Sequence, residues 1–121
     1  MGTRAMWTFK ENAKDKTGFN VYKHWDGYPD AALGFLTKAL TKSWELPRYE
    51  PDEFAASFIT ANKEGSGDVR LLPSGYWFDV APGDIEYRYE VYMSGITLTL
   101  KGYSVDNDKS TLVLSKSIKK S

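Results

Sequence analysis

Apolar and polar side chains alternate in two short runs near the start of the chain. In residues 3–10 the apolar face of an extended strand would consist of Ala5, Trp7 and Phe9. In residues 19–25 the same alternation gives an apolar face of Phe19, Val21 and Trp25. A polar segment that ends in Thr17-Gly18 separates the two runs. Period-two alternation is typical of half-buried strands, so we expect a β-hairpin whose apolar faces point into the core.

A strand-to-helix corner is expected at Asp26-Gly27-Tyr28-Pro29. Gly27 permits a positive φ, and the proline disfavours helical geometry for Tyr28. Asp30 then suits the start of a helix, which we expect to end at Leu46-Pro47. The apolar stripe of this helix has helical spacing and consists of Leu33, Leu36, Leu40 and Trp44, widened by Phe35 and Ala39.

A second helix is indicated at Glu50-Pro51, because proline suits the first helical turn and the acidic residues beside it favour the helix dipole. Its apolar positions recur at helical spacing and are Phe54, Ala55, Phe58 and Ile59. Gly65-Ser66-Gly67 is expected to end it. The two helices together would cover one side of a core.

From Val69 onward the period changes back to that of strands. The alternating or apolar runs are residues 69–72, 76–80, 84–93 and 96–101, followed by Leu112, Leu114 and Ile118. Turns are expected at Ser94-Gly95 and at Asp106-Asn107-Asp108. The expected fold is of the α+β class, with an N-terminal hairpin, two helices and then an antiparallel β-meander, all strands forming one sheet packed by the helices. Residues 1–121 are expected to form a single domain.

Composition narrows the classes of partner. The 16 basic and 16 acidic residues balance, which argues against nucleic acid because phosphate binding needs an excess of Lys and Arg. The chain has no cysteine and no repeated spacing of metal ligands, so we expect neither a metal nor a cofactor. Without an apolar run of membrane-spanning length or a signal-peptide pattern, we expect a cytoplasmic protein that does not bind membranes.

The polar face of the second expected strand consists of Tyr22, His24 and Asp26. If Phe9 pairs with Phe19, Arg4 falls opposite His24 and diagonal to Asp26. These residues would then form one polar cluster, an anion or polar-ligand pocket in which His24 can donate a proton. The alternative is a structural network, in which Asp26 caps the turn and Arg4 pairs with it.

Aromatic residues make up 15% of the chain, more than a small core needs, so several should reach the surface and serve recognition. Trp77 lies in a stretch bounded by prolines and is the best candidate for an exposed anchor, although a loop folded down as a lid over the core is the alternative. The residues expected to bind a partner are therefore Arg4, Tyr22, His24, Asp26, Tyr28 and Trp77.

Two segments carry a resemblance. The chain opens with Met-Gly-Thr-Arg and continues after the hairpin with Tyr22-Lys23-His24-Trp25-Asp26-Gly27-Tyr28-Pro29. This resembles a group of small phage and prophage proteins that start with Met-Gly/Ser-Thr-Arg and carry a Tyr-x-His-Trp-Asp-Gly-Tyr-Pro motif. Residues 84–91 are a weaker echo of the same group. The resemblance implies a phage or mobile-element accessory protein in a bacterial cytoplasm, and it implies no catalytic role for any residue.

Three functions remain open at this point. The first is a non-enzymatic binding module that blocks a host or anti-phage defence protein or holds a small ligand. The second is a small hydrolase or transferase for an anionic substrate, with His24 as acid and base, Arg4 as anion clamp and Asp26 beside them. The third is a binder of single-stranded nucleic acid, which would need an exposed sheet face made of Tyr22, Tyr87, Tyr89 and Lys101.

Overall fold

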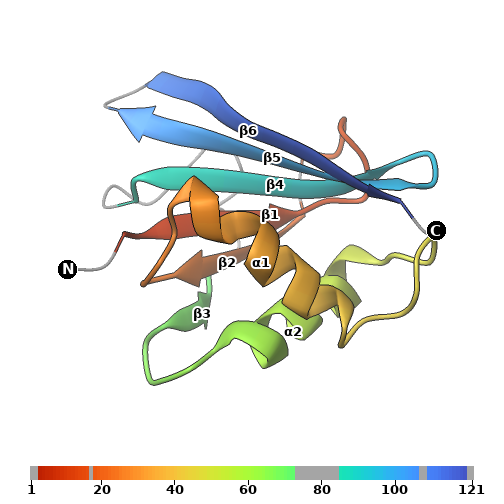
Figure 1. Cartoon of the computed structure of the whole chain (residues 1–121), viewed down its shortest axis with the longest axis horizontal. Helices are drawn as coiled ribbons and strands as arrows, with labels where there is room; N and C mark the ends of the chain where they lie inside the picture. Colours follow the sequence, from red (N-terminus) through yellow and green to blue (C-terminus); the bar gives the residue numbers. More distant parts are fainter. Residues whose placement is uncertain (1–2, 17, 73–84, 107–108, 120–121) are drawn as a thin grey trace.

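The computed structural model describes residues 3–16, 18–72, 85–106 and 109–119. In these residues two helices pack on one six-stranded sheet, with strand order β3-β2-β1-β4-β5-β6 (Figure 1). The elements are β1 (Ala5–Phe9), β2 (Phe19–Lys23), α1 (Pro29–Leu40), α2 (Pro51–Asn62), β3 (Val69–Leu71), β4 (Tyr87–Ser94), β5 (Thr97–Asp106) and β6 (Lys109–Lys119). The expected α+β class, with one sheet packed by two helices, is confirmed.

The sheet is mixed, so the expectation of an antiparallel sheet throughout is wrong. β1 pairs antiparallel with β2 but parallel with β4, where Ala5 lies opposite Tyr87 and Phe9 opposite Val91. The chain therefore returns to the free edge of its own first strand, and β1 becomes an interior strand of the sheet. The pattern along a strand assigns its faces but not its neighbours, which is why alternation alone did not reveal the parallel pair.

The C-terminal strands form the expected antiparallel meander from β4 through β5 to β6. Its first turn comes one residue later than expected, because Ser94 pairs with Thr97 and the two turn residues are Gly95 and Ile96. Gly95 has a φ of 64°, which explains why glycine suits this turn. The expected strand at residues 69–72 is β3, whereas the one at residues 76–80 lies outside the described residues.

The N-terminal hairpin has the expected register, with Phe9 opposite Phe19. Its first strand turns Trp7 and Phe9 into the core as expected, and Val21 joins them from the second. The inward placement of Phe19 and Trp25 was wrong, since their side chains are 48% and 43% exposed. Trp25 follows the end of β2 at Lys23, so period two no longer fixes its direction. Phe19 begins β2 at a position that β3, paired only with Val21–Lys23, does not flank.

The first helix is shorter than expected and presents a different stripe. It ends at Leu40 rather than at Leu46-Pro47. Its core-facing positions are Ala32, Phe35, Leu36, Ala39 and Leu40, a regular helical series in which small alanines allow close approach to the sheet. Leu33 and Trp44 were wrongly placed in the core, because Leu33 lies beside this stripe and Trp44 lies after the helix end, and both are exposed.

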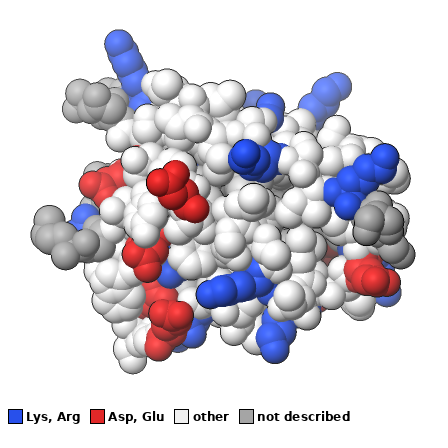
Figure 2. All heavy atoms as spheres, viewed as in Figure 1, with Lys and Arg blue, Asp and Glu red and all other residues white. Residues whose placement is uncertain are grey.

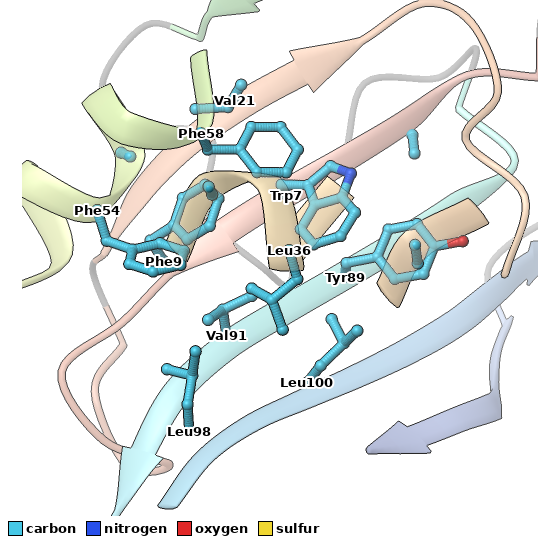
Figure 3. Packing of buried hydrophobic residues seen from close by; sticks show 14 of the residues in the cluster. Trp7, Phe9, Val21, Leu36, Phe54, Phe58, Tyr89, Val91, Leu98 and Leu100 are labelled. Atoms are coloured by element: carbon cyan, nitrogen blue, oxygen red, sulfur yellow. The ribbon is translucent and has the colours of Figure 1, made fainter. Parts of the chain in front are cut away.

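The second helix matches the expectation. α2 begins at Pro51, and its core positions are Phe54, Ala55 and Phe58, with Ile59 partly buried. The helix packs on Trp7 at the centre of β1, whose ring centre lies 4.6 Å from that of Phe58 (Figure 3). The Trp7 ring centre also lies 4.5 Å from that of Tyr89 on β4. One aromatic cluster therefore joins α2, β1 and β4.

The strand-to-helix corner is packed directly onto β1. A Cβ atom on Gly27 would lie 2.6 Å from the Thr3 carbonyl oxygen and 2.8 Å from Ala5 Cβ, so only glycine fits. The positive φ expected at Gly27 instead belongs to Asp26, at 58°. Tyr89 holds the corner from inside the core, since its hydroxyl donates to the Gly27 carbonyl oxygen at 2.5 Å. Burial raises the pKa of Tyr89 well above its usual range, so this phenol remains a donor even in alkaline solution.

We expect Tyr89→Phe to lower the free energy of unfolding by about 1–3 kcal/mol, because it leaves the buried Gly27 carbonyl without its donor. Urea denaturation followed by tryptophan fluorescence measures this change. Tyr28→Phe is the matched control, since Tyr28 is exposed, and it should change stability by less than about 0.5 kcal/mol. Equal losses in both variants would contradict the anchoring role of Tyr89.

Candidate functional site

A cleft of about 240 Å³ opens where β2 ends, next to edge strand β3. The residues that line it are His24, Trp25, Ser66, Gly67 and Arg70. His24 and Trp25 directly follow β2, Arg70 is the middle residue of β3, and Ser66 and Gly67 belong to the loop that joins α2 to β3. We call this surface the His24 cleft.

A buried ion pair fixes the two walls of the His24 cleft against each other. Lys23 Nζ lies 2.9 Å from Asp68 Oδ1, and both side chains are almost completely buried. Lys23 also lies 4.6 Å from the centre of the Phe35 ring, so α1 covers the pair. The Asp68 carbonyl oxygen accepts the His24 N–H at 2.7 Å. The loop after α2 is therefore tied to the last residue of β2 and to the residue after it.

Tyr22 is the platform of the His24 cleft. Its ring is 3% exposed and packs with Met6 and Ile85 on the sheet face opposite the helices. Its hydroxyl lies 2.9 Å from His24 Nδ1. Arg70 pairs with Tyr22 across β2 and β3, and its guanidinium carbon lies 4.5 Å from the centre of the Tyr22 ring. The buried Tyr22 side chain therefore contacts both the His24 imidazole and the Arg70 guanidinium.

Trp25 supplies the apolar wall. Its ring meets that of His24 edge to face, with 4.9 Å between the ring centres. At 43% exposure, Trp25 presents a large apolar surface to solvent beside the guanidinium of Arg70. Such an amphipathic surface is typical of recognition sites, where tryptophan and arginine contribute much of the binding free energy.

The structure brings together only part of the predicted cluster. Tyr22 and His24, which alternation placed on one strand face, are in contact. Asp26 is exposed and, like Arg4, does not line the His24 cleft. Arg4 instead offers its main-chain carbonyl oxygen to the N–H groups of Glu86 and Tyr87. Strand β2 ends before Asp26, so the alternation that placed Asp26 beside His24 no longer applies there.

The two predicted aromatic anchors have different outcomes. Tyr28 is exposed, as expected, but it precedes α1 as the N-cap residue and does not line the His24 cleft. Trp77 lies outside the described residues.

Sequence reasoning missed Arg70, Ser66 and Gly67. Arg70 was placed correctly in a short strand, but nothing local indicates that this strand pairs with β2 and sets Arg70 beside Tyr22. Ser66 and Gly67 were interpreted as part of a loop that ends a helix, and no binding role was assigned to them. The exposed glycine-serine loop directly before an arginine-bearing strand was the one available signal.

Lys10, Glu90 and Tyr103 form a second polar cluster, on the sheet face opposite the helices. Lys10 Nζ lies 2.6 Å from Glu90 Oε2, and both side chains are at most 10% exposed. The Tyr103 hydroxyl donates to Glu90 at 3.4 Å, and burial together with the Glu90 charge raises the pKa of Tyr103 to about 12. These groups satisfy one another, so the cluster is structural in character.

Two of the tyrosines that were expected to form an exposed surface for single-stranded nucleic acid do not reach the surface. Tyr22 and Tyr89 are both buried. They also lie on opposite faces of the sheet, since Tyr89 packs with the helix-side core and Tyr22 with the other cluster. On the face drawn in Figure 2 the Lys and Arg side chains are separated by uncharged surface rather than joined in a basic stripe. The predicted set of Tyr22, Tyr87, Tyr89 and Lys101 therefore does not form one exposed stacking surface.

In the described part of the chain, no three His, Asp or Glu side chains gather closely enough to hold a metal ion. Neither described helix is long and apolar enough to cross a membrane. No protein family model, curated protein or solved structure matches this chain.

We expect Tyr22→Phe to release the His24 ring while leaving the ring of residue 22 under Arg70. The lost hydrogen bond should lower the free energy of unfolding by about 0.5–1.5 kcal/mol. It should also change the tautomer balance of His24, because the Tyr22 hydroxyl bonds only Nδ1. Nitrogen-15 NMR of the imidazole measures that balance. An unchanged spectrum would contradict the role of Tyr22 in orienting His24.

Proposed function

We propose that this chain is a small binding module of the phage or prophage accessory type. It would act in a bacterial cytoplasm by holding a host or anti-phage defence protein, or a small ligand, at the His24 cleft. The observation that carries the proposal is that two exposed residues, Trp25 and Arg70, line one cleft, with the Arg70 guanidinium held over the buried Tyr22 ring. The phage setting rests on the sequence motif of residues 22–29 and on the opening tetrapeptide.

Preorganisation supports binding as the role of this surface. The buried Lys23–Asp68 pair and the Tyr22 platform hold the cleft walls in place before any partner arrives. Because the cleft is already ordered, binding a partner at Trp25 and Arg70 costs this chain little conformational entropy, which favours affinity.

The enzymatic alternative needs Arg4, His24 and Asp26 around one reacting group. Of these three, only His24 lines the His24 cleft, and its Nδ1 is engaged by Tyr22. A general acid–base mechanism needs its groups within hydrogen-bonding reach of the same substrate atom. The geometry therefore favours binding over catalysis.

The test is affinity capture from a bacterial lysate with matched tryptophan variants. Trp25→Ala removes the exposed wall of the cleft, whereas Trp44→Ala removes a tryptophan of similar exposure, 38%, elsewhere on the surface. We expect wild type and Trp44→Ala to retain the same protein or small molecule, identified by mass spectrometry. Trp25→Ala should retain at least about tenfold less, which corresponds to about 1.4 kcal/mol of binding free energy.

Two results would contradict the proposal. One is the absence of any retained protein or small molecule with wild type. The other is equal retention by the two tryptophan variants, which would place the binding surface away from the His24 cleft.

A further inference from the structure

We infer that the His24 cleft binds a phosphate monoester carried on an aromatic group, with the phosphate at Arg70 and the aromatic group against Trp25. This inference rests on the proposed binding function and names the chemistry of the ligand.

The charges around the cleft favour an anion. Arg70 is a permanent cation, and the residues that line the cleft include no acidic side chain. Two acids adjoin lining residues in the sequence: Asp68 is buried and has its charge neutralised by Lys23 at 2.9 Å, and Asp26 is exposed and does not line the cleft. The Arg70 guanidinium lies over the Tyr22 ring, and its planar fork of donors matches the oxygens of a phosphate.

The loop wall adds neutral donors. In the described part of the chain, no group bonds the Ser66 hydroxyl or the main-chain N–H of Gly67. Gly67 has a φ of 81°, and a Cβ atom built on it would meet nothing within 4 Å, so its main chain borders open space. Free hydroxyl and N–H donors beside an arginine form a suitable cradle for phosphate oxygens. His24 adds a further ring nitrogen on the opposite wall.

Size and shape account for the aromatic part. A volume of about 240 Å³ exceeds what a lone phosphate fills and leaves room beside Trp25. The exposed indole of Trp25 can stack on a planar ring, which is worth about 0.5–1.5 kcal/mol beyond the area that it buries. A phosphate on an aliphatic group would lose this contact. The cleft therefore distinguishes aryl phosphates and nucleotides from inorganic phosphate.

The test is an NMR titration of the full chain, following the amide signals of Ser66 and Gly67. The probes are phenyl phosphate, adenosine monophosphate, inorganic phosphate and phenol. We expect both aromatic phosphates to shift these signals saturably and to bind several-fold more tightly than inorganic phosphate. Phenol, which has no charge, should leave the signals in place.

Matched arginine variants locate the anion. Arg70→Ala should weaken the binding of phenyl phosphate by at least about tenfold, since it removes a charge-assisted pair. Arg70→Lys keeps the charge but not the planar fork and should show an intermediate loss. Arg48→Ala is the control, because Arg48 is also exposed and lies over an aromatic ring, that of Trp44, at 3.4 Å. Arg48 precedes α2, whereas the loop that lines the cleft follows α2. This variant should bind like wild type.

The order of the two aromatic probes identifies the source of the ligand. Tighter binding of adenosine monophosphate indicates a free nucleotide, and tighter binding of phenyl phosphate indicates a phosphorylated aromatic side chain of a partner protein. The inference is overturned if neither probe shifts Ser66 and Gly67, or if Arg48→Ala and Arg70→Ala lose affinity equally. Should Trp25-dependent capture persist in that case, the binding function would stand and only the ligand chemistry would be wrong.

Discussion

The buried ion pair between Lys23 and Asp68 is the interaction on which the His24 cleft depends. Two charges this deeply buried are stable only because each neutralises the other, and removing either would leave an uncompensated charge inside the protein. The main chain of Asp68 adds a second contact, because its carbonyl oxygen accepts the His24 N–H. Together the ion pair and this hydrogen bond attach the loop from α2 to the end of β2.

The rest of the cleft follows from that attachment. With the loop held at Asp68, β3 begins at once and pairs with β2, which sets Arg70 across from Tyr22. Tyr22 is buried on the side of the sheet away from the helices, so its ring and hydroxyl are fixed supports for Arg70 and His24. Trp25 remains exposed because the strand has already ended. A rigid interior thus presents a small set of exposed groups, which is the arrangement that preorganised recognition requires.

Local periodicity predicted what depends on one element at a time. The inward face of β1 and the whole apolar stripe of α2 followed from spacing, because burial against a core imposes period two or 3.6. The pairing of two strands that are distant in the sequence produces no periodic pattern in either strand. The parallel β1–β4 pair and the β2–β3 pair that brings Arg70 to the site were therefore missed. Trp25 was misplaced because the period-two alternation was continued past Lys23, where the strand ends.

The most direct test of this account is amide hydrogen exchange in Lys23→Met, which keeps the length of the side chain but leaves Asp68 buried without its partner. We predict that protection of the His24 amide, bonded to Asp68, falls by a much larger factor than protection of the Trp7 amide in the interior strand β1. The cleft would then open locally while the sheet stays closed. Equal loss of protection at both amides, or none at His24, would contradict the claim that this ion pair builds the cleft.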